Sequence, residues 1–220
     1  MCIRDRAIGA HPDDIEFGCS GTLIRHIKKG DNVVYVCMTN TESKSGTTGD
    51  VLRTNDELFD EVKCATDKMG IKITEFLDFK DLHVPFSFDS VSTLDRLIQK
   101  HKVDTIYTHW AGDSNQDHIS TFKSTMAAAR YVRNVYCYEQ IPIPRLTENE
   151  MTINYYVDIS DHMEDKIQVA ECHGSQIKKY KKIGFDVPNR LRVLAEFRGI
   201  QANCKYAEGF HIIKKVENGC

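Results

Sequence analysis

Hydrophobic residues fall into short β-branched runs that alternate with longer segments of helical spacing. The runs typical of strands lie at 32–39 (NVVYVCMT), 103–109, 134–140, 152–159 and 210–215, with a weaker one at 71–79. Helical patterns cover 17–29, 52–69, 90–101, 117–131, 160–180 and 188–200. This alternation predicts an α/β fold whose mostly parallel sheet has helices on both faces. Because no repeat, low-complexity tract or linker interrupts the pattern, we assign residues 1–220 to a single domain.

The first six residues, MCIRDR, do not fit this pattern. The buried first strand of an α/β domain should be rich in Val, Ile and Leu, yet Arg4, Asp5 and Arg6 stand where it should begin. MCIRDR also reads as the translation of a transposase-end adapter used in sequencing libraries. We therefore expect these residues to be a non-native sequencing artefact. The true upstream sequence, with any targeting segment, would then be missing.

Composition and charge narrow the classes of protein. No apolar run is long enough to span a bilayer, so we expect no membrane span. The formal charge of −3 gives no global basic field, which argues against nucleic acid as a partner. The lysine-rich stretch 177–184 is typical of a solvated helix face. The eight cysteines are scattered without a CxxC pair, which predicts free thiols and a cytoplasmic location.

The segment HPDD (11–14) raises the first question of chemistry, because two adjacent carboxylates repel each other unless they are hydrated or bind a cation. It lies where an apolar run gives way to a helix. His11 and Asp14, three residues apart, can face one point while Asp13 projects elsewhere. The alternative is that Asp13 and Asp14 only cap the helix.

A second polar cluster, THWAGDSNQDHIST (108–121), follows the predicted strand at 103–109 and contains His109, Asp113, Asn115, Asp117 and His118. The ends of parallel strands are where α/β folds bind ligands, and the polar loop 39–50 should lie at the same edge. A set of His11, Asp14 and His118 would leave one metal position open for water, as catalytic zinc sites do. The same set also suits non-haem Fe²⁺.

Several motifs in order give the chain a family resemblance. AHPDD, GCSGTLIRHIKKGD (18–31), DSNQDH (113–118), HGSQ (173–176) and RGIQANCKYAEGF (198–210) resemble those of the LmbE-like (PIG-L) zinc-dependent N-deacetylases. That family removes acetyl groups from N-acetylglucosamine-type sugars and related glycosides. The resemblance implies a Rossmann-like domain, zinc held by His11, Asp14 and His118, and Asp13 as the general base. The expected products are acetate and a free amine.

The sequence departs from the family at Asn115, where many members carry a histidine that stabilises the oxyanion. Asparagine can donate a hydrogen bond but brings no positive charge, so either the amide suffices or His109 substitutes. Arg53 and His173 are candidates for binding substrate, although a solvated arginine at a helix start and a packing histidine are equally good interpretations. Glu208, in the last motif, is similarly ambiguous.

Two other functions stay open. One is a sugar- or nucleotide-binding α/β module without hydrolysis, although the chain lacks the GxGxxG fingerprint of dinucleotide sites. The other is a different metal-dependent enzyme, such as an esterase or an Fe²⁺ oxygenase. We expect the partner to be a small N-acetylated amino sugar or glycoside, and the sequence is compatible with a homo-oligomer. The sequence does not choose the sugar or the aglycone.

Overall fold

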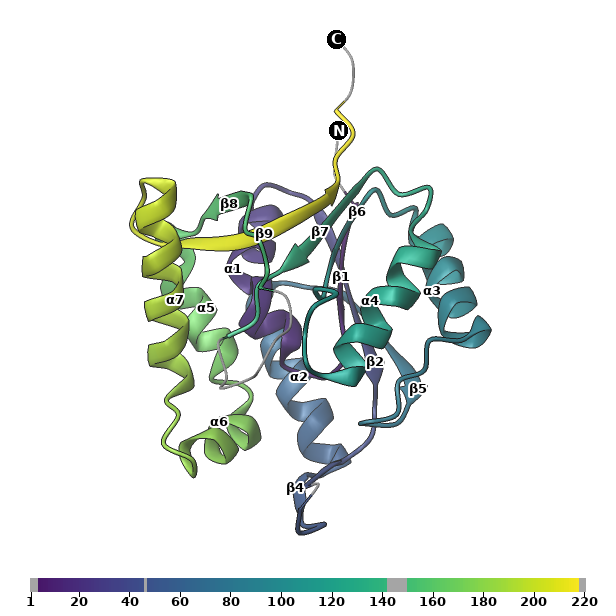
Figure 1. Ribbon diagram of the computed structural model, residues 1–220. Helices are drawn as coiled ribbons and strands as arrows, with labels where there is room; N and C mark the ends of the chain where they lie inside the picture. The colour runs from purple at the N-terminus through teal and green to yellow at the C-terminus, as the bar shows by residue number, and fades with distance from the viewer. Residues whose placement is uncertain (1–3, 46, 142–149, 218–220) are drawn as a thin grey trace.

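One seven-stranded sheet forms the centre of the computed structural model, which describes residues 4–45, 47–141 and 150–217 (Figure 1). In sheet order the strands are β5 (Ile73–Phe79), β2 (Asn32–Thr39), β1 (Arg4–Gly9), β6 (Thr105–Thr108), β7 (Asn134–Tyr138), β9 (Ala207–Lys214) and β8 (Tyr155–Asp158). The first five strands in this order pair in parallel, and β9 pairs antiparallel with both β7 and β8. The predicted mostly parallel sheet is confirmed.

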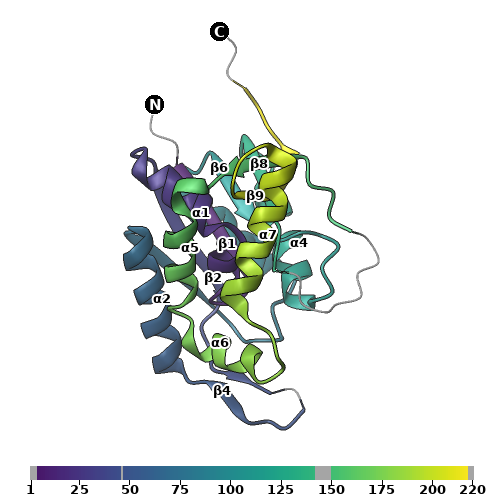
Figure 2. The same cartoon turned by 90° about the vertical axis from the view of Figure 1, so that its left-hand side faces the viewer.

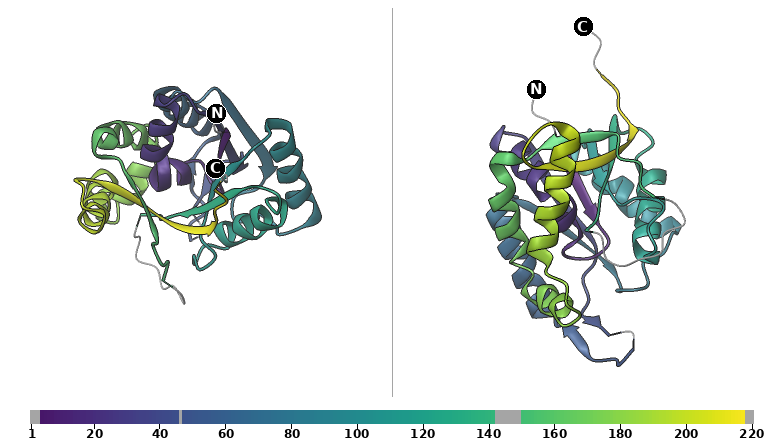
Figure 3. Two further views of the ribbon diagram at one scale, coloured as in Figure 1. Left: turned by 90° about the horizontal axis from the view of Figure 1, so that it is seen from above. Right: turned by 60° about the vertical axis from the view of Figure 1, so that its left-hand side comes forward.

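Helices cover both faces of the sheet, also as predicted (Figures 1 and 3). One hydrophobic cluster joins the sheet to α1 (Asp14–Lys28), α2 (Asn55–Met69), α5 (Met163–Ala170) and α7 (Val187–Ala202). A second cluster joins the opposite face to α3 (Phe88–His101) and α4 (Gln116–Ala128). The apolar residues of these helices therefore belong to the cores on the two faces of the sheet, which explains why hydrophobic spacing located these elements.

Two regions differ from the sequence-based expectation. The predicted helix 160–180 is divided into a 3₁₀ turn (η1, Ser160–His162), α5 and α6 (Gly174–Lys181). The division falls at Glu171–His173, where the His173 backbone leaves the helical region. The polar loop after β2 contains a short hairpin of β3 (Ser43–Lys44) and β4 (Val51–Arg53). Figure 2 shows that α6 and β4 lie together at one end of the molecule.

Strand β1 includes part of the anomalous N-terminal hexapeptide. Asp5 and Arg6 are fully buried in it. Burial, followed by the charges of Asp31 and Asp104, raises the pKa of Asp5 to about 8. Arg6 donates to the Leu97 carbonyl at 2.8 Å, but its Nε and Nη1 atoms have no hydrogen-bond partner among the described residues. Because buried charges without full pairing are costly, this supports the proposal that MCIRDR is not native.

A disulfide joins Cys64 of α2 to Cys172, which follows α5. The expectation of free thiols is wrong for this pair, because the packing of α2 against α5 brings together cysteines 108 residues apart. The other described cysteines, Cys19, Cys37, Cys137 and Cys204, are free. Cys2 and Cys220 lie outside the described residues. Within the described part of the chain, no helix combines the length and apolarity needed to cross a membrane.

Candidate metal and catalytic site

The two polar clusters meet because of the strand order. From β1 the chain moves outward to β2 and β5, and then returns to β6 on the other side of β1. Ligand sites in open α/β sheets lie beyond the carboxyl ends of the strands at such a reversal. HPDD follows β1 there, and the loop before α4 follows β6. Gly18 lets α1 pack closely against Tyr138 of β7, since a Cβ atom at this position would lie 2.4 Å from the Tyr138 ring.

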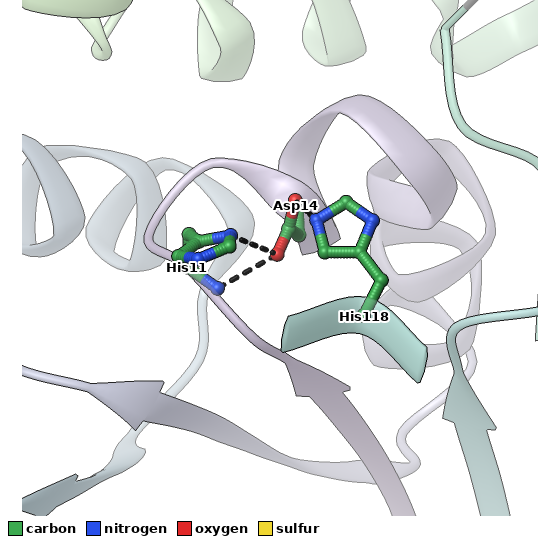
Figure 4. A group of neighbouring side chains, drawn as sticks. All are labelled: His11, Asp14 and His118. Carbon is green, nitrogen blue, oxygen red and sulfur yellow. Dashed lines mark hydrogen bonds and ion pairs between the residues drawn. The ribbon is translucent and has the colours of Figure 1, made fainter. Parts of the chain in front are cut away.

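His11, Asp14 and His118 form a compact group in which the carboxylate lies between the two imidazoles (Figure 4). Asp14 Oδ2 is 3.5 Å from His11 Nδ1, and Asp14 Oδ1 is 3.3 Å from His118 Nε2. Ligand atoms bound about 2.0–2.2 Å from one tetrahedral zinc ion lie about 3.3–3.5 Å from each other. The donor types and their spacing therefore fit a divalent metal.

Three carboxylates contact the other ring nitrogens of the two histidines. His11 Nε2 is 3.0 Å from Asp117 Oδ2 and 3.2 Å from Asp81 Oδ1. His118 Nδ1 is 2.7 Å from Asp113 Oδ2. In metal sites such carboxylates fix the orientation of the ligating imidazole. Sequence reasoning missed Asp81, although its position just after β5 was a signal that it could reach this edge of the sheet.

The electrostatic field of the group favours a cation. Burial alone would lower the pKa of His11, but hydrogen bonds to Asp117, Asp14 and Asp81 raise it well above its usual value. Burial likewise opposes a raised pKa of His118, which the Asp14 charge and the Asp113 hydrogen bond nevertheless produce. Carboxylates that hold protons on both imidazoles would also stabilise a metal ion in their place.

Asp13 differs from its neighbour in conformation and environment. It is 8% exposed and lines a cavity of about 400 Å³ together with His11, Asp14 and His118. Burial and the charge of Asp14 raise the pKa of Asp13 to about 6, while Arg53 acts in the opposite direction. Its backbone φ of 135° is strained for a residue other than glycine. Asp13 occupies the N-cap position of α1 without a side-chain capping bond, so capping does not explain this residue.

Two further residues from the sequence prediction line the same cavity. Asn115 is the N-cap of α4, and its Oδ1 accepts a hydrogen bond from the Asp117 backbone N–H. Arg53 is buried and donates through Nη1 to the Pro12 carbonyl at 2.8 Å, while its Nε has no hydrogen-bond partner among the described residues. Both residues place a side chain that carries N–H donors at the cavity wall.

The structure places His109 and His173 behind the cavity wall rather than in it. Both are fully buried. His109 Nε2 lies 3.1 Å from Asp14 Oδ2, and its ring stacks on His118 with centroids 3.9 Å apart. Burial and the charge of His118 lower the pKa of His109 to about 4, which leaves it neutral. This position suits support of Asp14 better than contact with substrate.

His173 lies between two carboxylates, with Nε2 3.0 Å from Glu16 Oε1 and Nδ1 3.8 Å from Glu61 Oε2. Gln140, which sequence reasoning missed, does line the cavity and donates to the Asp14 backbone carbonyl at 3.1 Å. It follows β7, so its position after a parallel strand was the only signal in the sequence.

Comparisons with known proteins agree on a family. "Uncharacterized deacetylase YaiS" of Escherichia coli K12 is 33% identical over 139 residues, covering 60% of this chain and 71% of that protein. "Diacetylchitobiose deacetylase" of Thermococcus kodakarensis is 26% identical over 230 residues, covering 95% of this chain and 82% of that protein. The family model PIG-L, described as GlcNAc-PI de-N-acetylase, matches residues 6–129.

A solved structure shows how widely the fold is used. GalB of Pseudomonas putida KT2440, a 4-carboxy-2-hydroxymuconate hydratase, superposes with a TM-score of 0.80 at 19% identity, covering 99% of this chain and 100% of that one. The fold alone therefore does not select the reaction. The family model is more specific, because it covers more than half of the chain, including HPDD and the start of α4, which carries His118. The protein belongs to the PIG-L family of de-N-acetylase enzymes.

Proposed function

We propose that the protein is a metal-dependent hydrolase that removes the N-acetyl group from an N-acetylglucosamine-type amino sugar or glycoside. The observation that carries this proposal is one cavity that contains both a His-Asp-His ligand set and the buried carboxylate of Asp13, which makes no helix-capping hydrogen bond. Family membership and the deacetylase names of the two sequence relatives support the reaction class. We propose zinc as the metal, with Fe²⁺ as the alternative that the same ligands accept.

His11, Asp14 and His118 would hold the metal. When bound, it supplies a Lewis acid that polarises the amide carbonyl and lowers the pKa of water to about 7. Asp13 accepts the proton of the attacking water and delivers it to the amine as the amide C–N bond breaks. A carboxyl group with a pKa of about 6 suits both roles, because it is ionised at neutral pH yet basic enough to take a proton.

The remaining polar groups of the cavity would position the substrate. The side-chain N–H of Asn115 donates a hydrogen bond to the carbonyl oxygen of the substrate as negative charge develops there. Arg53 donates to a hydroxyl or carbonyl oxygen of the sugar. Both residues line the cavity.

The direct test uses the full chain loaded with zinc or Fe²⁺. Acetate and free amine are measured with methyl N-acetylglucosaminide and with N,N′-diacetylchitobiose as substrates. We expect the two products in equal amounts, loss of activity after chelation and recovery when the metal is returned. Stoichiometric metal without acetate release from either sugar would contradict the proposal and favour the binding module or another hydrolase.

A further inference from the structure

A second cavity of about 450 Å³ adjoins the first at the end of the molecule where α6 and β4 meet (Figure 2). Lys178, Lys179, Lys181 and Lys182 line it, and we call this group the lysine basin. Leu52 and Lys179 line both cavities, so one wall separates the basin from the metal-binding residues. Its volume is in the range of small-molecule sites.

The lysine basin carries a larger excess of positive charge than the first cavity. The first cavity contains the carboxylates of Asp13, Asp14 and Asp81 together with the cationic side chains of Lys44, Arg53 and Lys179. The basin has four lysines and a single carboxylate, Glu57. That carboxylate already accepts hydrogen bonds from the Thr54 backbone N–H at 2.9 Å and from its hydroxyl at 3.1 Å. The whole chain, by contrast, carries a formal charge of −3.

Three lysines of the basin make no ion pair in the described part of the chain. Lys178, Lys181 and Lys182 are exposed, and no ion pair to a described carboxylate involves them. Lys179 donates to Gln176 Oε1 at 3.3 Å, lies over the Tyr180 ring and acts electrostatically on Asp13. Like charges gathered without counter-charges repel one another, so these lysines would attract and stabilise an anion.

We propose that the lysine basin binds an anionic group, a phosphate or a carboxylate, carried by the substrate on the far side of its N-acetylated sugar. This inference rests on the proposed function, because it places the acetamido group at Asp13 and the metal ligands. The rest of such a substrate extends past Leu52 and Lys179 into the basin. Lysine ammonium groups recognise phosphate and carboxylate as mobile point charges, which suits aglycones of several shapes.

The test compares substrates that differ in charge, using the full, metal-loaded chain. We measure kcat/KM for N-acetylglucosamine 1-phosphate, for the carboxymethyl glycoside of N-acetylglucosamine and for the neutral methyl glycoside. We expect at least one anionic substrate to be preferred about tenfold over the neutral one, equivalent to about 1.4 kcal/mol. This preference should fall as salt screens the lysines. The two anionic substrates distinguish phosphate from carboxylate.

Variants test whether the basin lysines cause the preference for anionic substrates. Replacing Lys178, Lys181 and Lys182 together by Gln should remove most of this preference, and replacing them by Arg should preserve it. The matched control changes Lys29, Lys72 and Lys123 to Gln, which removes the same charge at exposed positions outside both cavities. Thermal unfolding checks that each variant is folded. Lys179 stays unchanged, because its charge acts on Asp13.

Each outcome decides the proposal. Equal kcat/KM for anionic and neutral substrates, or equal loss of preference in the Gln variant and its control, would overturn the subsite while leaving deacetylation intact. If no substrate is hydrolysed, the proposed function fails instead. Calorimetry then tests the subsite separately, with N-acetylglucosamine 1-phosphate and the methyl glycoside as ligands. The phosphate should bind more tightly than the methyl glycoside, and the Gln variant should lose this difference.

Discussion

Adjacent residues of one chemical type have different properties in this site because their neighbours differ. Burial would raise the pKa of Asp14, yet the charge of His118 and the hydrogen bonds of His109 and His11 hold it well below its usual range. At Asp13, burial and the charge of Asp14 outweigh the opposing charges of Arg53, His173 and Lys179, and its pKa is raised to about 6. The HPDD spacing alone predicted that the two side chains diverge. Their separate environments depend on residues more than 90 positions away, which no local motif reveals.

Asn115→His tests whether this position faces the reacting carbonyl. We expect metal content to be unchanged, because the proposed ligands His11, Asp14 and His118 are all retained. A histidine of ordinary pKa, about 6.5, would add positive charge mainly below that pH, so the kcat/KM profile should change most on the acid side. Identical profiles between pH 5 and 9 would show that residue 115 does not contact the carbonyl.

Asp5→Ile tests the foreign hexapeptide. Since the folded pKa of Asp5, about 8, exceeds the unfolded value of 3.8, the folded state binds the proton more tightly and stability falls as pH rises between these values. The gain from Asp5→Ile should therefore grow from pH 4 to pH 8, by at most about 1.4 kcal/mol per pH unit, and then level off. Urea unfolding at pH 6 and pH 8 measures it, with exposed Asp56→Asn as control. No gain at either pH would indicate a native, adapted strand.

At the scale of elements, Glu208 joins α1, α5 and β9. The backbone of α1 leaves the helical region at Cys19. The N–H groups of Gly21 and Thr22 instead donate to the Glu208 carboxylate at 2.9 and 2.7 Å. Lys166 of α5 donates to the same carboxylate at 2.6 Å. Glu208, ambiguous in the sequence, is therefore a buried structural residue that fixes the helix from which Asp14 projects.

Glu208→Ala should be strongly destabilising, because two backbone donors lose their acceptor and the buried Lys166 ammonium loses its counter-charge, keeping only the Phe17 and Glu16 carbonyls as acceptors. Removing one partner of a buried ion pair typically costs about 3–5 kcal/mol. Urea unfolding is measured for Glu208→Ala and for the double variant Glu208→Gln with Lys166→Met. The comparison separates the cost of an unpaired buried charge from the cost of weakened backbone hydrogen bonds. The double variant should lose less, since no buried charge remains. A loss below about 1 kcal/mol in Glu208→Ala would contradict this role.

The sequence located most helices and the strands of the seven-stranded sheet well, and it missed the short hairpin. Strand β2 has the predicted bounds, and each long helix was located by its apolar stripe. The hairpin of β3 and β4 is too short to show a period. The metal-site residues were predictable because HPDD and the cluster at 108–121 each follow a strand and are rich in His and Asp. Asp81 and Gln140 also follow strands, but as single polar residues their approach to the site depends on the order of the strands in the sheet.

For the whole molecule, the Cys64–Cys172 disulfide is the main departure from expectation. Disulfides persist in oxidising compartments, so the proposed cytoplasmic location loses the support that free thiols gave it. Thiol titration of the purified, unfolded chain should find two fewer thiols before reduction than after it. Reduction should lower the free energy of unfolding by about 5 kcal/mol, as expected for a closed loop of about 100 residues. An equal thiol count before and after reduction would refute the pairing.

Asp13 and Asp14 of HPDD are assigned different roles, and one side-by-side measurement of bound metal and deacetylation tests this assignment. Asp14→Ala should lose both metal and activity, because it deletes one of three ligands. Asp13→Asn should keep stoichiometric metal but lose roughly 10²- to 10⁴-fold in turnover, about 3–5 kcal/mol of barrier, since a general base is removed. If Asp13→Asn turns over as fast as the parent, or Asp14→Ala retains full metal, the assigned roles are wrong.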